Sequence, residues 1–276
     1  MYLTQGLHRA LQCTPDATAT VFGGRTRTFA EHTDRIAPLA GGLRSIGIAT
    51  DDRVGIVSLS SDRYAEYLPA VLWADAVLNP VNIRWNPAEI AYSIDDSDAR
   101  VLLIDDAFAP IIPVLRDSCP GLRTIVYCGE GATPENTVSY ETLVADSKPV
   151  DDARRCGDSL AGIFYTGGTT GFPKGVMLSH ANMVTSALGT VSTGELLSGD
   201  ASFLHAAPMF HLADRVLCRR QHPTPSCPAR RERNEQAPPR SRTSALNRVP
   251  VPPATGGPRR NRRCRSLPPR PPRRPR

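Results

Sequence analysis

The sequence contains no apolar run near the 18 or so residues that a membrane-spanning helix requires, so we expect no membrane span. The first 20 residues lack a basic stretch followed by an apolar core, and we expect no secretory signal. Lysine is nearly absent, since only Lys148 and Lys174 occur among 276 residues. The seven cysteines form no CxxC pair and are odd in number, which argues against a disulfide framework or a metal site. We therefore predict reduced thiols in a cytoplasmic protein.

The charged residues divide the chain into two unequal parts. Residues 1–214 carry 15 basic and 25 acidic residues, a net charge of −10. Residues 215–276 carry 18 arginines, no lysine and 2 glutamates, a net charge of +16. The formal charge of +6 for the whole chain thus describes neither part. The acidic first part is not the surface of a nucleic-acid-binding protein, because it would repel phosphate.

Residues 215–276 hold 14 of the 26 prolines, and no aromatic residue follows Phe210. Such a composition cannot bury enough apolar surface to offset chain entropy, so we predict a disordered basic Pro/Arg-rich tail. Three interpretations remain: a basic arm for nucleic acid or anionic lipid, a proline-rich ligand or spacer, and translation of a GC-rich gene in a shifted frame. We favour the shifted frame, because apolar periodicity and aromatic residues stop within a few positions of Asp214.

Residues 1–214 alternate helical and strand-like patterns. A T-x-x-E capping box formed by Thr28 and Glu31 opens an apolar helical face, Pro38 interrupts it, and Ser61 is placed to cap the next helix. Helices are predicted over residues 27–47, 62–74 and 86–95, and strands over residues 53–60, 77–81, 100–104, 123–127, 160–165 and 176–178. This alternation indicates an α/β fold with largely parallel sheets flanked by helices.

A segment able to bind a polyphosphate lies between the last two predicted strands. Glycine removes side chains, so backbone N–H groups can approach an anion closely, while hydroxyls and a lysine add donors and charge. The residues concerned are Thr166, Gly167, Gly168, Thr169, Thr170, Gly171 and Lys174. The segment is not a Walker A loop, because Pro173 precedes the lysine and Gly175 follows it. The plainer interpretation is a flexible Gly/Thr turn.

Residues 163–174 resemble the phosphate-loop signature of the adenylate-forming (AMP-binding) superfamily at all twelve positions. The Tyr-Thr-Gly-Gly variant at residues 165–168 is most similar to that of bacterial fatty-acid–CoA ligases. The resemblance extends over nearly all of residues 1–214 and ends with a Pro-Met-Phe-His element at residues 208–211.

The resemblance implies the N-terminal part of a fatty-acid–CoA ligase. In such an enzyme a carboxylate attacks the α-phosphate of ATP, which releases pyrophosphate, and the CoA thiol then displaces AMP. It implies that residues 166–174 hold the β- and γ-phosphates, that Thr166 contacts Mg²⁺, and that Lys174 and His211 are catalytic, with His211 beside the acyl or adenylate site. From the residues alone a hydrogen-bonded core histidine is the favoured interpretation of His211, and the Pro-Met-Phe-His context puts the two interpretations on an equal footing. The implied partner is a fatty acid or related carboxylate, with no stable nucleic-acid partner.

Later elements of the family do not follow in this sequence. There is no Tyr-Gly-x-Thr-Glu segment, no Thr-Gly-Asp segment and no C-terminal domain with its catalytic lysine. We therefore expect residues 1–214 to be an incomplete AMP-binding domain whose ligase activity is impaired by truncation. The alternatives are a noncatalytic ATP- or pyrophosphate-binding remnant, and nucleic-acid binding through the arginine-rich tail. Asp75 also stands where relatives usually carry glycine in a tight strand entry.

Overall fold

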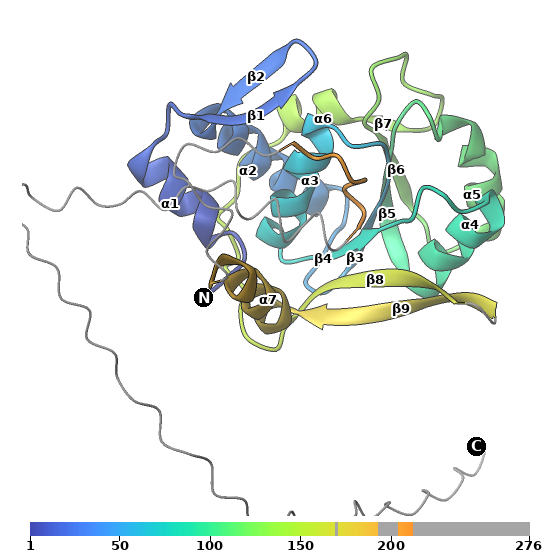
Figure 1. Cartoon of the computed structure of the whole chain (residues 1–276). Coiled ribbons are helices and arrows are strands. Elements are labelled where there is room, and N and C mark those ends of the chain that lie inside the picture. The colour runs from blue at the N-terminus through green and yellow to red at the C-terminus, as the bar shows by residue number, and fades with distance from the viewer. Residues whose placement is uncertain (169–170, 193–203, 212–276) are drawn as a thin grey trace, which may run out of the picture. The chain divides into compact units, whose positions relative to one another are not determined.

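The computed structural model describes residues 1–168, 171–192 and 204–211 (Figure 1). The predicted phosphate ligands Thr169 and Thr170 and the predicted tail at residues 215–276 lie outside these residues. No helix in the described ranges is long and apolar enough to cross a membrane.

The described helices and strands follow the predicted alternation. The helices are α1 (Gln5–Cys13), α2 (Phe29–Ser45), α3 (Asp62–Trp73), α4 (Pro87–Asp96), α5 (Ile112–Ser118), α6 (Tyr140–Asp146) and α7 (His180–Ser192), with a short 3-10 turn η1 (Ala109–Ile111). The strands are β1 (Thr18–Phe22), β2 (Arg25–Thr28), β3 (Arg53–Val57), β4 (Val77–Pro80), β5 (Ala99–Ile104), β6 (Thr124–Tyr127), β7 (Val138–Ser139), β8 (Leu160–Gly168) and β9 (Gly171–Ser179).

Seven of the described strands form one sheet in the order β7-β6-β5-β3-β4-β8-β9, and β1 and β2 form a separate antiparallel hairpin. Every neighbouring pair in the large sheet is parallel except β8 and β9. The predicted α/β class with a largely parallel sheet is therefore confirmed.

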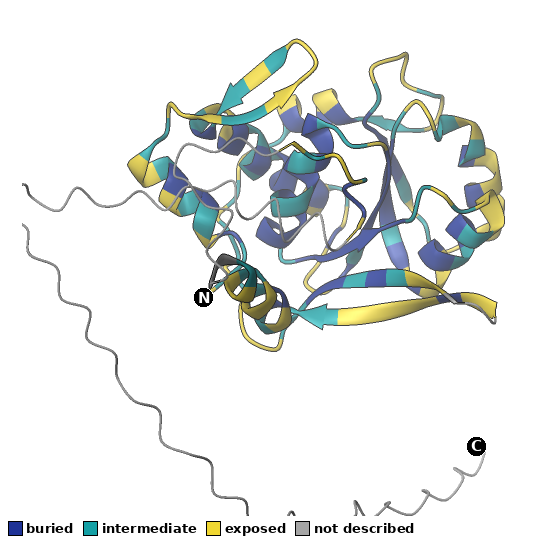
Figure 2. Cartoon of the chain, in the orientation of Figure 1, coloured by how far each residue is buried: buried dark blue, intermediate teal, exposed yellow. Residues whose placement is uncertain are grey.

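Helices cover both faces of this sheet (Figure 1). Successive side chains of a strand point to opposite faces, so Val101 and Leu103 of β5 join the core under α2 and α3, whereas Leu102 and Ile104 join the core under α4 and α5. Figure 2 shows the central strands buried and the far half of the β8–β9 hairpin exposed. The sheet is thus sandwiched at its centre and open at the β9 end.

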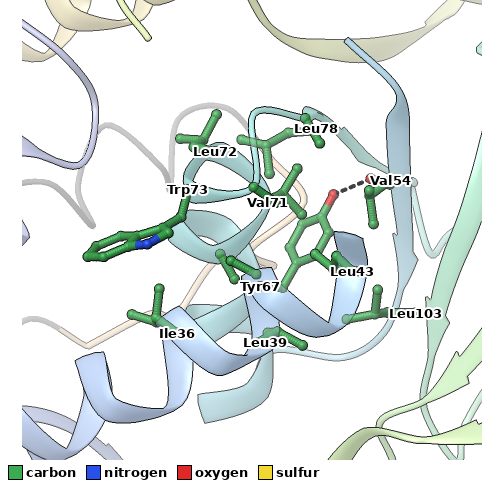
Figure 3. Close-up of a cluster of buried hydrophobic side chains, with 14 of the residues drawn as sticks. Ile36, Leu39, Leu43, Val54, Tyr67, Val71, Leu72, Trp73, Leu78 and Leu103 are labelled. Carbon is green, nitrogen blue, oxygen red and sulfur yellow. Dashed lines mark hydrogen bonds between the residues drawn. The ribbon is translucent and has the colours of Figure 1, made fainter. Parts of the chain in front are cut away.

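Tyr67 shows how α3 is tied to the sheet (Figure 3). Its fully buried ring belongs to the core that also contains Ile36 and Leu39 of α2, while its hydroxyl donates to the Val54 carbonyl at 2.7 Å. The same hydroxyl accepts from the Asn79 backbone N–H at 3.2 Å. One phenol therefore links α3 to both β3 and β4, and fixes the strand ends that follow.

The predicted helix starts are confirmed with one change of boundary. Thr28 and Glu31 form the capping box, and Ser61 accepts from the Tyr64 N–H at the start of α3. A capping box of Asn86 with Glu89 opens α4, with Pro87 in its first turn. The first of these helices begins at Phe29 rather than at residue 27, because residues 27 and 28 pair with β1 as the end of β2.

Asp75 adopts the left-handed conformation that favours glycine, with a φ of 66°. Its carboxylate accepts from the Thr50 hydroxyl at 2.5 Å and lies 3.2 Å from the Arg155 guanidinium. These side-chain contacts offset part of the cost of the left-handed backbone, which explains how an aspartate is accommodated there.

The order in which the chain adds strands to the sheet reverses next to β3, although the strands stay parallel. From β3 the chain crosses to β4 on one side through α3, and from β4 it returns past β3 to β5 on the other side through α4. The loops after β3 and β5 thus lead to opposite faces. In sheets of this kind, ligands bind in the crevice outside the carboxyl ends of the strands at such a point.

Candidate functional site

The glycine-rich segment forms the outer part of the β8–β9 hairpin. We expected a loop beginning at Thr166, but the strands continue to Gly168 and Gly171, with Thr166 opposite Lys174. The loop boundary is therefore wrong, because these residues pair with each other across the hairpin. The register is irregular between Thr166 and Gly168, where Gly167 of β8 lies opposite two residues of β9, Phe172 and Pro173, so the extra residue of the bulge is on β9.

The glycines of the hairpin serve different purposes. A Cβ on Gly175 would lie 2.9 Å from Ile163 Cγ2 and 3.0 Å from Tyr165 Cζ, so this glycine is required by packing. Gly171 has a φ of 144°, a conformation that other residues rarely adopt. Its two chain neighbours apart, a Cβ on Gly167 would meet no atom of the described residues within 4 Å. Packing therefore does not explain Gly167, whereas close approach of a ligand to its backbone would.

The hairpin rests against α4 and the residues that precede it. The Tyr165 hydroxyl donates to the Asp96 carboxylate at 2.5 Å, and the Phe172 ring stacks on Tyr92 at 4.7 Å. Burial and this hydrogen bond raise the pKa of the Tyr165 phenol well above its usual value. Trp85 meets the Tyr165 ring edge-on at 6.4 Å. The phenol is thus neutral and acts as an anchor for the hairpin.

Lys174 and Thr166 are exposed, whereas Pro173 is buried. The Thr166 hydroxyl donates a long hydrogen bond of 3.5 Å to the Lys174 carbonyl, and the Lys174 ammonium has no ion pair among the described residues. Both side chains are therefore available to an anion that approaches the hairpin.

His211 belongs to a short turn at residues 208–211. The Met209 N–H donates to the Ser60 hydroxyl at 3.1 Å, and Met209 and Phe210 are buried. His211 itself is exposed, its N–H donates to the Pro208 carbonyl at 3.0 Å, and its ring lies 4.3 Å from that of Phe210. The interpretation of His211 as a core histidine is therefore wrong.

The sheet brings these two elements to one edge. Leu78 of β4 is paired in parallel with Gly162 of β8, so residues 165–168 extend past the carboxyl end of β4. Ser60, which holds the His211 turn, follows the carboxyl end of β3. Strands β3 and β8 are separated only by β4, a spacing of about 10 Å. The described ones among the predicted phosphate and catalytic residues thus share the edge where ligands bind in such sheets.

Two buried carboxylates of α3 are already paired with arginines. Asp62 accepts from Arg25 at 2.8 Å and also from Arg27, while Glu66 accepts from Arg35 at 2.8 Å. Burial would raise the pKa of the Asp62 carboxyl, but the hydrogen bonds and charges of Arg25 and Arg27 outweigh it and hold the pKa at about 2. These groups stabilise the fold and are not suited to general acid or base chemistry.

The described residues include no group of three or more His, Cys, Asp or Glu side chains that could hold a metal ion. The four described cysteines are free, and burial raises the pKa of the Cys128 thiol to about 12, so it stays protonated. A phosphate-bound Mg²⁺ needs few protein ligands, because phosphate and water oxygens fill most of its shell. The exposed Thr166 hydroxyl fits the role of one such ligand.

Sequence reasoning missed Ser60 and Asp105, which follow β3 and β5 on either side of the point where the chain reverses. The Asp105 carboxylate accepts from the Ser58 hydroxyl at 3.0 Å and from the Leu59 N–H at 2.7 Å. These bonds end β3 at Val57, shorter than the predicted strand over residues 53–60. The signal in the sequence that could have identified them was the presence of polar residues just after two apolar strands.

Comparison with known proteins agrees with this arrangement. The AMP-binding enzyme family matches residues 7–218. The chain is 35% identical over 186 residues to a long-chain-fatty-acid–CoA ligase of Thermus thermophilus, covering 67% of this chain and 34% of that protein. It is 34% identical over 205 residues to a feruloyl-CoA synthase of an Amycolatopsis species, covering 74% of this chain and 38% of that protein.

The fold has solved counterparts as well. A putative long-chain-fatty-acid CoA ligase from Rhodopseudomonas palustris superposes with a TM-score of 0.70 at 25% identity, covering 80% of this chain and 56% of that one. The mostly parallel sheet with helices on both faces is thus that of the N-terminal domain of adenylate-forming enzymes. More narrowly, the chain belongs to the AMP-binding enzyme family. It spans about a third of the length of the curated relatives named above.

Proposed function

We propose that this chain is the ATP-binding part of an AMP-forming acid–CoA ligase, with a fatty acid as the carboxylate. In that reaction a carboxylate oxygen attacks the α-phosphorus of ATP and pyrophosphate leaves. The CoA sulfur then attacks the acyl carbon and AMP leaves. The relatives named as CoA ligases support the reaction class, and the first of them supports a fatty acid. Feruloyl-CoA synthase makes an aromatic acid the nearest alternative.

The observation that carries this proposal is the open space around the exposed Gly167 beside an exposed lysine. Backbone N–H groups of the hairpin would bind the polyphosphate, and the Lys174 ammonium would neutralise its charge. His211 would lie across β4 from the phosphates, beside the reacting carboxylate. The residues proposed to hold the nucleotide are Thr166, Gly167, Gly168, Thr169, Thr170, Gly171 and Lys174, with Thr166 as the contact for Mg²⁺ and CoA as the second substrate.

The proposal extends to what the chain does alone. Family segments expected after the His211 turn do not follow it in this sequence. Lids and closing domains complete sites of this kind. We therefore propose that the chain binds ATP or pyrophosphate but turns it over poorly.

Calorimetric titration with ATP and Mg²⁺ tests the binding step. Lys174→Ala removes the proposed phosphate contact and should weaken binding about tenfold or more, since charge-assisted bonds contribute about 1.5–3 kcal/mol. Lys148→Ala is a matched control, because Lys148 is the other lysine of the chain and is exposed. Equal affinity of the Lys174 variant and the wild type would rule out the phosphate site. Fatty-acid-dependent exchange of pyrophosphate into ATP, above a Lys174→Ala background, would show that the chain is an active ligase.

A further inference from the structure

A single carboxylate organises the turn at the point where the chain reverses. Asp105 follows β5 directly, and one of its oxygens accepts from both Ser58 and Leu59, which follow β3. Its other oxygen accepts from the Ala107 N–H at 3.1 Å. Asp105 thus ties the turn after β3 to the turn after β5, on the two sides of the crevice expected there.

The turn after β3, at residues 58–60, holds the segment that carries His211. Ser60 is the next residue after the two that Asp105 binds, and its hydroxyl accepts from the Met209 N–H. This bond joins positions 149 residues apart in the sequence. In the turn at 208–211, Met209 and Phe210 are buried, Pro208 is half-buried and His211 is exposed.

We propose that Asp105 and Ser60 are positioning residues that fix His211 at the crevice between β3 and β5. Asp105 sets the shape of the turn at residues 58–60, and Ser60 transmits it to Met209. The importance of this position for ligation rests on the proposed function. The geometric inference itself concerns the free chain and requires no ligand.

The neighbouring residue supplies a matched control. Asp106 also follows β5 and also accepts from three groups, but these are the Tyr127 hydroxyl and the N–H groups of Glu130 and Gly131. Its hydrogen bonds organise the loop after β6 and make no contact with residues 58–60. Asp105→Asn and Asp106→Asn therefore remove equal charge from adjacent positions with different predicted effects.

Amide hydrogen exchange of the full chain, resolved by NMR, tests the inference. Ser60→Ala should speed exchange of the Met209 amide roughly 2- to 10-fold, the range expected for one hydrogen bond. Ser60→Thr, which keeps the hydroxyl, should restore protection. Asp105→Asn should also speed Met209 exchange and shift the His211 ring proton resonances, whereas Asp106→Asn should speed exchange at Gly131 and leave Met209 unchanged.

Unchanged Met209 exchange in Ser60→Ala, or equal effects of the two aspartate variants on Met209, would overturn the inference. These measurements are made without nucleotide, so they separate the two proposals. If the exchange changes occur but ATP does not bind, the proposed function fails and the positioning role stands. If ATP binds but Met209 exchange does not respond, the positioning role fails alone.

Discussion

Substitution by alanine should lower the stability of the chain at Gly175 but weaken ATP binding at Gly167. A methyl group at Gly175 would be 2.9 Å from Ile163 Cγ2 and 3.0 Å from the Tyr165 ring, closer than real Cβ contacts allow. The ring cannot retreat freely, because Asp96 holds its hydroxyl. Overpacking of this size costs about 1–3 kcal/mol, so Gly175→Ala should lower the free energy of unfolding by that amount.

Gly167→Ala provides the contrast. Among the residues that the structure describes, no atom outside the two chain neighbours lies within 4 Å of the added methyl, and Gly167 is not among the glycines with positive φ. The unfolding free energy of Gly167→Ala should stay within about 0.5 kcal/mol of the wild-type value. Any increase in stability would come from the lower entropy of the unfolded chain. ATP binding should weaken about tenfold, because the methyl would keep phosphate from the backbone N–H.

Urea unfolding followed by circular dichroism gives the stability of each variant, and calorimetric titration gives its affinity for ATP with Mg²⁺. Because the hairpin can open locally, amide exchange along β8 and β9 is measured as well. The reasoning would be refuted if Gly167→Ala destabilised the chain as much as Gly175→Ala does. It would also be refuted if Gly167→Ala bound ATP with wild-type affinity.

Substitutions at three further positions test the fold. The pKa of Asp62 in the folded chain is about 2, below its ordinary value of 3.8. The carboxylate therefore stabilises the fold fully above pH 3.8, and this stabilisation is lost as the pH falls toward 2. In acid unfolding, the wild type should lose about 2 kcal/mol of unfolding free energy over this range that Asp62→Asn does not lose. Asp75→Ala should be about 1–2 kcal/mol less stable than Asp75→Gly in urea unfolding, because the Cβ of alanine destabilises the left-handed backbone conformation and glycine has none. Tyr67→Phe should cost about 1–3 kcal/mol by thermal unfolding, because two buried backbone groups lose a partner, and an unchanged Tm would contradict this.

Local signals in the sequence were sufficient where structure is decided locally. The capping box at Thr28 was visible as residue types at a fixed spacing, and the helix begins there. Strands were predicted over residues 53–60 and 100–104, and β3 and β5 form there, with side chains in both cores. The position of Asp75 was also recognised as a glycine-like site, and its φ is positive.

Contacts between distant residues were beyond such signals. Glycine and threonine locally favour a turn, so the pairing of Thr166 with Lys174 could not be anticipated; the docking of Tyr165 on Asp96 holds the hairpin extended. The bond between Ser60 and Met209 spans most of the described chain and leaves no periodic trace. The predicted phosphate residues were found from the Gly-, Thr- and Lys-containing motif between two strands and from its resemblance to the family signature, and their assignment stays a prediction.

The composition of β9 also bears on the behaviour of the protein in a crowded solution. In the described part of the chain, β9 is the last strand of the sheet, so one row of its backbone groups faces outward. Pro173 offers no N–H to an incoming strand, and Lys174 next to it would place like charges together if two copies met edge to edge. Pro173 and Lys174 should therefore also reduce edge-to-edge pairing of sheets from different copies, and with it aggregation.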